Sequence, residues 1–208
     1  MKKEFSFYEF VGIIVPGVTF LFFSELVIEQ IYHKVIIDFS KVGESIVFVI
    51  ISYGIGHILQ SVGNLFELVM WKAFGSMPTQ WLNQKNRFGK NLFDAEMAEK
   101  IKTKAFEQFG GNSKRDYGRD AYSWLSQIEK TTEKRIDVFN ANYSLFRGLT
   151  ITFYILAIIV WIYVGWKEAL FPIILGFLSN LRMYRFAKLY ASEIFRTYLI
   201  HKENRGLL

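Results

Sequence analysis

Long stretches without a charged residue constrain this chain more than any other feature of its sequence. Four such stretches occupy residues 10–24, 45–66, 148–166 and 169–181. A helix needs roughly 20 residues to cross about 30 Å of hydrocarbon, and the second and third stretches are about that long. Because 51% of the chain is hydrophobic and its apolar residues are clustered, the sequence predicts a membrane protein rather than a soluble domain.

The other two stretches depend on the residues beside them. The first can span when Tyr8 and the two flanking glutamates lie at the interfaces, and Pro16-Gly17 should kink it. The fourth contains Pro172 and requires Lys167 and Arg182 as its interfacial ends. We therefore predict an all-α polytopic membrane protein with a small cytoplasmic helical bundle and four transmembrane helices, at about 7–28, 44–66, 147–166 and 168–184.

The predicted spans divide the chain into four segments. Residues 1–71 form an N-terminal membrane hairpin, and residues 147–184 form a C-terminal membrane hairpin. Between them, residues 72–146 form a cytoplasmic helical domain, and residues 185–208 form a cytoplasmic tail helix. Because the tail is too short to be a domain alone, we expect it to pack against the middle domain.

Basic residues fall almost entirely on one side of this arrangement. Of the 25 Lys and Arg, 22 precede the first span, lie between the second and third spans, or follow the fourth. Only Lys34, Lys41 and Lys167 lie on the other side. Cytoplasmic loops carry such an excess, so we predict a multi-pass protein of the bacterial inner membrane with both termini cytoplasmic. The formal charge of +6 follows from this topology, while direct nucleic-acid binding stays open.

Start and stop signals define the helices of the middle domain. Asp94 has the position of an N-cap, and Gly110-Gly111 close the amphipathic helix that follows it. A second helical pattern covers residues 121–146 without Gly or Pro. This pattern predicts either one rod of about 45 residues that continues into the third span, or a break at Asn140–Asn142.

Most catalytic and metal-binding signatures are missing from the sequence. The chain has no cysteine and only three histidines, which excludes thiolate chemistry and leaves little for a metal site. It also contains no phosphate loop ending in Lys-Ser/Thr, no G-x-S-x-G and no H-E-x-x-H. We therefore predict a protein without enzymatic activity, cofactor or metal.

One short pattern favours an enzyme instead. Arg196 and His201 fit R-x4-H, the motif of HEPN ribonucleases, in which His acts as general acid or base and Arg stabilises phosphate charge. The alternative is a cationic tail helix, because so short a motif often arises by chance. Five steps along a helix also place the two side chains roughly 140° apart.

A polar stripe within the second span is the other candidate site. Its members follow one another at steps of four, three, four and three residues: Tyr53, His57, Gln60, Asn64 and Glu67. Such spacing puts them on one helix face, and polar groups in a bilayer should face protein or water. The stripe predicts either hydrogen bonds between helices or the lining of a pore or polar cavity.

Several membrane motifs and the tail form a further pattern. They are Phe7-Tyr8-Glu9-Phe10, Val15-Pro16-Gly17, Gly54-x-Gly56-His57-Ile58-Leu59-Gln60, and Phe195-Arg196 to His201. These motifs resemble small inner-membrane proteins of bacterial phage defence, among them the membrane accessory proteins of type VI-B CRISPR systems. The resemblance implies membrane disturbance or modulation of an RNA-targeting partner during infection. One accessory type resembles a pore-forming HEPN protein, and Arg196 and His201 would be its motif positions.

Taken together, the patterns predict a homo-oligomeric inner-membrane effector or accessory protein of antiviral defence that forms or gates a polar path. Its expected partners are the lipid bilayer, further copies of the chain and an RNA-guided defence complex. Two alternatives stay open: a membrane-tethered HEPN-like ribonuclease that uses Arg196 and His201, and a membrane scaffold for a cytoplasmic complex.

The topology is testable because the chain has no native cysteine. Single cysteines at Ser40, Ser113 and Asn204 would be treated with an impermeant thiol reagent in intact cells. We expect labelling at Ser40→Cys only, since the basic-residue distribution places the other two positions inside. Labelling of Ser113→Cys or Asn204→Cys before permeabilisation would contradict the predicted orientation.

Overall fold

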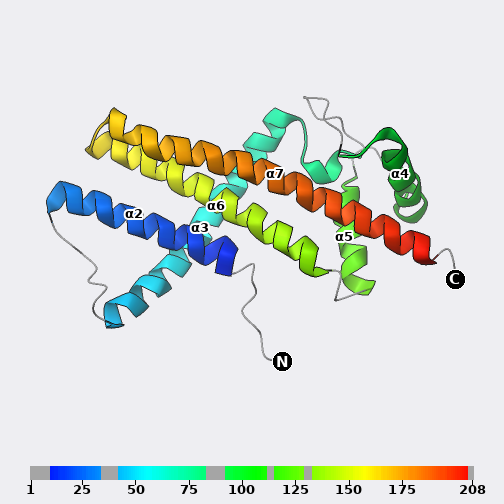
Figure 1. Cartoon of the computed structure of the whole chain (residues 1–208), viewed down its shortest axis with the longest axis horizontal. Helices are drawn as coiled ribbons and strands as arrows, with labels where there is room; N and C mark the ends of the chain where they lie inside the picture. Colours follow the sequence, from blue (N-terminus) through cyan, green and yellow to red (C-terminus); the bar gives the residue numbers. More distant parts are fainter. Residues whose placement is uncertain (1–9, 34–41, 83–91, 112–114, 129–132, 206–208) are drawn as a thin grey trace. The chain divides into compact units, whose positions relative to one another are not determined.

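A computed structural model describes residues 10–33, 42–82, 92–111, 115–128 and 133–205 (Figure 1). Every regular element in these ranges is a helix, so the all-α prediction is confirmed. The motif residues Phe7, Tyr8 and Glu9 and the loop residues Lys34 and Lys41 lie outside the described ranges.

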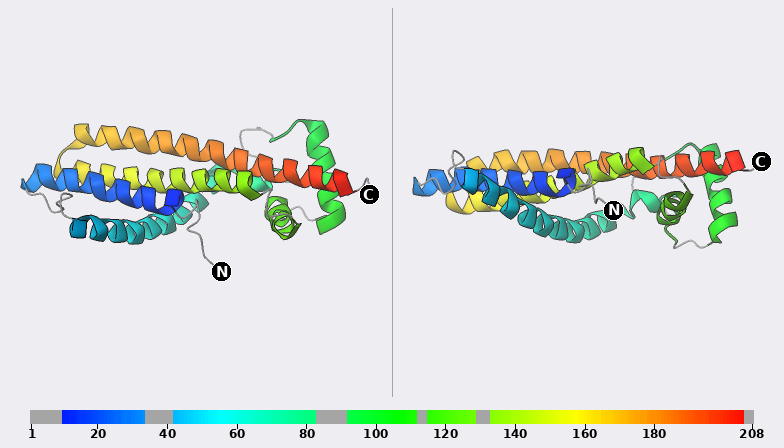
Figure 2. Two further views of the ribbon diagram at one scale, coloured as in Figure 1. Left: turned by 60° about the horizontal axis from the view of Figure 1, so that its bottom comes forward. Right: turned by 90° about the horizontal axis from the view of Figure 1, so that it is seen from below.

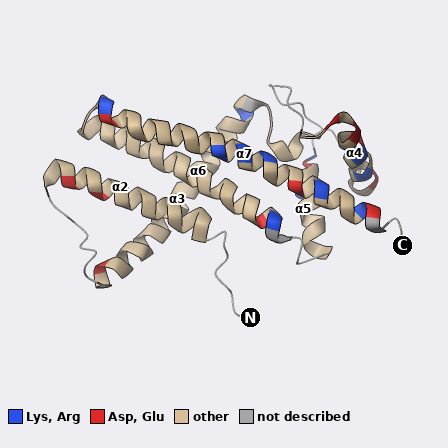
Figure 3. Ribbon diagram, viewed as in Figure 1, with Lys and Arg blue, Asp and Glu red and all other residues tan. Residues whose placement is uncertain are grey.

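Three helical segments are long and apolar enough to cross a membrane: Phe10–Tyr32, Gly43–Ala73 and Arg135–Tyr163. They belong to η1 (Phe10–Ile14) with α2 (Val15–Tyr32), to α3 (Val42–Phe74) and to α6 (Glu133–Tyr163). Figure 3 shows few charged residues along these helices. The fourth predicted span lies in α7 (Trp166–Arg205), which is not among the three. Its uncharged part, residues 169–181, extends only about 20 Å.

The contacts of the chain divide it into two compact units. Unit 1 comprises residues 1–67 and 141–184, and unit 2 comprises residues 68–140 and 185–208. The helices α3, α6 and α7 each contribute residues to both units. The predicted division into membrane and cytoplasmic segments, with limits at residues 71, 146 and 184, stays a prediction.

Small residues let the helices of unit 1 approach closely. A Cβ added to Gly17 of α2 would overlap the Ser52 carbonyl of α3, and one added to Gly56 would overlap the Ile13 carbonyl. The α6 and α7 segments of unit 1 lie side by side after the tight connection at Val164 and Gly165 (Figure 2). Helices that associate without a hydrophobic driving force use such small-residue contacts to bring their backbones together.

The interruption expected at Pro16-Gly17 takes the form of a change in helix type. Residues Phe10–Ile14 form a π-helical turn, and α2 begins at Val15 with Pro16 in its first turn. Proline is tolerated in a first turn because the amides there have no acceptor within their own helix. Pro16 also cannot donate the bond that a continuous α-helix would send back to residue i−4. The carbonyl of Gly12 therefore lacks its ordinary α-helical donor.

In unit 2 the predicted capping signals are confirmed. The helix α4 covers Ala95–Phe109, and the side chain of Asp94 accepts a hydrogen bond from the Met97 amide at 2.8 Å. Gly110 ends the helix with a φ of 84°, a conformation that glycine adopts without strain. Both ends of α4 are thus fixed by local sequence.

The tail packs against the middle segment, as predicted. One core cluster joins residues of α4, of α5 (Tyr117–Ile128), of the start of α6 and of the end of α7. The contributions from α7 are Ile194, Phe195, Tyr198 and Leu199. The tail is nevertheless not a separate helix, because α7 continues through Pro172 to Arg205 without a break.

Both predictions for the second helical pattern are wrong. The helix α5 ends at Ile128 and α6 begins at Glu133, while the residues between lie outside the described ranges. The Tyr122 hydroxyl lies 3.4 Å from Asp137, whereas fifteen residues of one straight helix would separate these positions by about 22 Å. The chain therefore changes direction between the two segments, and they do not form one rod (Figure 2). Moreover, α6 passes through Asn140–Asn142 unbroken.

Tyr198 makes the stability of unit 2 sensitive to alkaline pH. Its hydroxyl lies 3.1 Å from both the Lys104 carbonyl and Gln108 Oε1, and burial together with the charge of Glu107 raises its pKa to about 12. The neutral hydroxyl is favoured in the folded state, so its contribution is complete below about pH 10 and is lost as pH rises through about 12.

We expect Tyr198→Phe to reduce the loss of stability between pH 10 and 12 relative to the wild type. The measurement is the denaturation midpoint of the purified protein, followed by circular dichroism across this range. Tyr32→Phe is a suitable control, because Tyr32 is exposed. Identical pH profiles for the wild type and Tyr198→Phe would contradict the assignment.

Candidate functional site

The polar stripe lies on α3, but burial divides it in two. Gln60 is 7% exposed, and the side chain of Glu67 is 15% exposed. Tyr53, His57 and Asn64 are exposed. The residues predicted as one set therefore face two environments.

Helix geometry explains this division. At about 100° per residue, the five side chains cover an arc of about 80°. Gln60 and Glu67 lie on the side of that arc toward the small residues Ser52, Gly56 and Gly63, which are all buried. The other edge of the arc turns away from the packed face. The stripe consequently marks the boundary between the inner and outer surfaces of α3.

Gln60 of α3 bonds to two other helical segments, η1 and α6. Its amide nitrogen donates to the Gly12 carbonyl of η1 and, at 2.9 Å, to the Ser144 carbonyl of α6. Its amide oxygen accepts from Arg147 of α6, at 3.1 Å from Nε and 2.9 Å from Nη2. Both ends of the amide are thus satisfied, as a buried polar group requires.

Proline and glycine residues give Gln60 its partners. Since Pro16 has no amide hydrogen, the Gly12 carbonyl is open to a donor from another helix. Gly148 of α6 provides the space, because an added Cβ would lie 2.6 Å from the Pro16 ring and 2.9 Å from the Gln60 amide nitrogen. The hydrogen bonds of Gln60 therefore depend on residues in two other segments.

Arg147 extends the network to Glu67. Its Nη1 donates to Glu67 Oε2, and the two side chains are 12% and 15% exposed. The guanidinium also lies 5.6 Å from the centre of the Tyr143 ring. An added Cβ on Gly63 would lie 3.1 Å from Arg147 Cγ, so glycine leaves room for the arginine stem. We call Gln60, Arg147 and Glu67 the polar clamp.

The clamp has the geometry of interhelical hydrogen bonding. Each nitrogen of the Arg147 guanidinium has an acceptor, and so does the amide nitrogen of Gln60. A buried ion pair of this kind is costly to break, because one uncompensated charge would remain. Its chemistry is that of a structural lock between α3, α6 and η1.

The outer half of the stripe has a different character. The rings of Tyr53 and His57 are 4.6 Å apart and meet edge to face at 89°. Asn64 follows two turns after His57 on the same exposed side. Around them the surface of α3 is apolar, with Ile50, Ile58 and Leu65 all exposed. These polar groups therefore interrupt an otherwise apolar outer surface.

The structure does not bring Arg196 and His201 together. Both lie on the unbroken helix α7, so about 140° separates them within one chain. Arg196 is exposed, with its guanidinium 6.0 Å from the centre of the Phe93 ring. Within the described ranges, no three His, Asp or Glu side chains gather as metal ligands would.

Sequence reasoning missed the role of Arg147. The sequence places Arg147 at the limit between the predicted middle domain, 72–146, and the predicted third span, yet Arg147 is the centre of the clamp. A usable signal was present, because Glu67 ends one uncharged stretch and Arg147 precedes another. Glu25, expected at an interface, is 8% exposed and so lies inside the protein.

We expect Glu67→Leu to destabilise the protein by about 3 kcal/mol, since Arg147 would stay buried without its counter-charge. The double variant Glu67→Leu/Arg147→Met should recover part of this loss. Thermal unfolding of the purified protein measures both effects. Glu96→Gln is the control, because its exposed pair with Lys100 should contribute less than about 1 kcal/mol. Additive losses in the double variant would contradict coupling within the clamp.

Comparison of the chain with protein-family models, with curated proteins and with solved structures found no match. The resemblance to phage-defence membrane proteins therefore rests on the motifs alone.

Proposed function

We propose that this chain is a non-enzymatic integral membrane protein that assembles with further copies of itself, so that the outer stripe residues line or gate a polar path. The observation that carries the proposal is the exposure of His57 and Asn64 on an apolar helix. Both lie inside the uncharged stretch 45–66, where α3 is long enough to span the bilayer.

The cost of polar groups in lipid supports assembly. A His or Asn side chain that faces hydrocarbon loses its hydrogen bonds to water, so such residues normally face protein or a water-filled space. In a single chain the outer stripe faces away from the other helices of unit 1. A second copy that covers this surface would supply polar partners and exclude lipid.

The clamp gives the path its fixed orientation. Gln60 and Glu67 are engaged with α6 and η1, so the proposed lining is limited to Tyr53, His57 and Asn64. Because the clamp prevents α3 from rotating about its axis, the outer residues stay on the side that meets the neighbouring copy. The inner residues of the stripe thus fix the orientation of α3, and its outer residues line the proposed path.

The fourth span and the orientation belong to the same proposal. The surface of α7 between residues 170 and 181 carries large exposed apolar side chains: Leu170, Phe171, Ile173, Ile174, Phe177, Leu178 and Leu181. An apolar surface of this extent favours contact with lipid. Together with the distribution of basic residues, it supports four spans in a bacterial inner membrane with cytoplasmic termini.

A role in antiviral defence is the biological context that we propose, and the motifs support it by resemblance. A partner that targets RNA would then act through the helical part of unit 2. The ribonuclease alternative requires two subunits to contribute Arg196 and His201, because one helix separates them. Incubation with RNA, without added metal, distinguishes this alternative from a pore.

Leakage from liposomes tests the proposed path. We expect His57→Leu and Asn64→Leu to lower dye leakage roughly tenfold, because an apolar constriction excludes water, while the protein still inserts and assembles. Val62→Leu is the matched control, since Val62 is exposed on α3 outside the stripe. Ser52→Leu is unsuitable as a control, because Ser52 is fully buried beside Gly17. Normal leakage and normal size-exclusion profiles for both stripe variants would exclude the path.

A further inference from the structure

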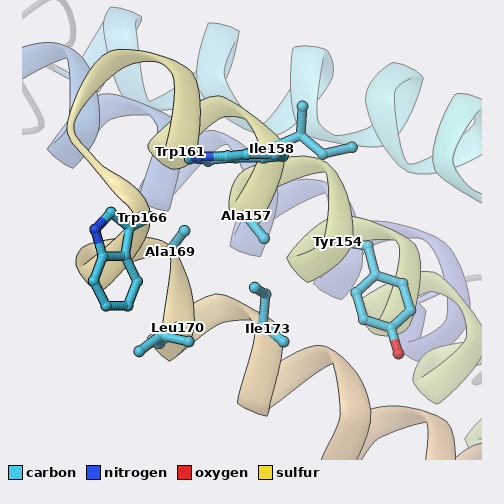
Figure 4. A pocket seen from close by; sticks show the side chains of 8 residues that line it. All are labelled: Tyr154, Ala157, Ile158, Trp161, Trp166, Ala169, Leu170 and Ile173. Carbon is cyan, nitrogen blue, oxygen red and sulfur yellow. The ribbon is translucent and has the colours of Figure 1, made fainter.

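A groove runs between α6 and α7 within unit 1 (Figure 4). One wall consists of α6 residues at helical spacing, and the other consists of α7 residues at the same spacing. Its volume is about 470 Å³, and its lining comprises Tyr154, Ala157, Ile158, Trp161, Trp166, Ala169, Leu170 and Ile173. Pockets of this size hold small ligands in many proteins.

The shape of the groove follows from its residue types. Ala157 and Ala169 are buried and form the floor, while Ile158, Leu170 and Ile173 are exposed along the rims. Small residues at the floor and large residues along the rims produce an apolar groove. From Tyr154 to Trp161 it extends about 10 Å along α6.

Two tryptophans line one end of the groove, and a lysine lies beside one of them. Trp161 and Trp166 are 65% and 62% exposed beside the connection between the two helices. The Lys167 ammonium lies 5.9 Å from the centre of the Trp166 ring, and Glu168 lines a different pocket, between α2, α6 and α7. Tryptophan and lysine are typical of the membrane–water interface.

We propose that this groove binds one acyl chain of an anionic phospholipid, with the lipid phosphate at Lys167. The inference rests on the proposed insertion of the chain into a membrane. A lipid in the bilayer has its headgroup at the interface and its tail in the hydrocarbon. Correspondingly, Trp161 and Trp166 line one end of the groove with Lys167 beside Trp166, and apolar side chains line the rest.

The dimensions favour a lipid tail over a helix from a second copy. A helix with its side chains is about 10–12 Å in diameter, whereas the floor of the groove is formed by Ala157 and Ala169 between rims of larger side chains. Contact with methylene groups along both walls stabilises an acyl chain. The lysine adds attraction for a negative headgroup.

Native mass spectrometry of the full-length protein in mild detergent tests this site, with dioleoyl phosphatidylglycerol and dioleoyl phosphatidylcholine as probes. We expect the wild type to retain one phosphatidylglycerol, and Ala169→Phe, which fills the floor, to lose it. Trp161→Ala removes only an exposed wall, so it should fold normally and bind at least about threefold more weakly. Lys167→Gln should reduce the preference for phosphatidylglycerol about fivefold. Leu178→Phe is the control, because Leu178 is exposed on α7 but does not line the groove.

Equal retention by the wild type, Trp161→Ala and Ala169→Phe would overturn the site. Loss of dimer in Ala169→Phe, with no lipid on the wild type, would assign the groove to a second copy and also overturn it. Carbonate washing of membranes separates the two proposals. Wild-type protein in the supernatant would overturn both the membrane function and the groove, whereas washed membranes that keep the protein, combined with absent lipid, would overturn the groove alone.

Discussion

The hydrogen bonds of one glutamine join η1, α3 and α6 of unit 1. Gln60 reaches the Gly12 carbonyl, the Ser144 carbonyl and the Arg147 guanidinium. No apolar residue could replace it, because the bonds join three segments at one point. Arg147 would then lose two of its contacts, and its pair with Glu67 would lose its lateral support.

Proline and glycine residues make these hydrogen bonds of Gln60 possible. Pro16 leaves the Gly12 carbonyl open, while Gly63 and Gly148 leave space for the arginine stem and for the glutamine amide. Gly17 lies against the Ser52 carbonyl, and Gly56 lies against the Ile13 carbonyl. These contacts bring η1 and α2 close enough to α3 for the bond from Gln60 to the Gly12 carbonyl. The clamp is therefore encoded by helix-breaking and small residues as much as by its polar members.

Local signals predicted part of this structure well. The capping residues Asp94 and Gly110 act within one turn of chain, so sequence alone identified both ends of α4. The periodicity of the stripe likewise identified one face of α3. It did not predict which half packs, since that depends on Arg147, 80 residues beyond Glu67. The change of direction between α5 and α6 also escaped prediction, because it depends on the unit 2 core, to which Leu125 and Ile136 both belong.

The separation of the clamp residues along the chain imposes an order on biogenesis. During synthesis Gln60 and Glu67 leave the ribosome 87 and 80 residues before Arg147. In the proposed membrane topology, the first two helices therefore insert before Glu67 has its counter-charge and before the Gln60 amide has all its partners. In that topology, both groups need water or another protein as a hydrogen-bond partner until α6 is made. A nascent chain that stops before Arg147 lacks the guanidinium that pairs with Glu67 and donates to Gln60.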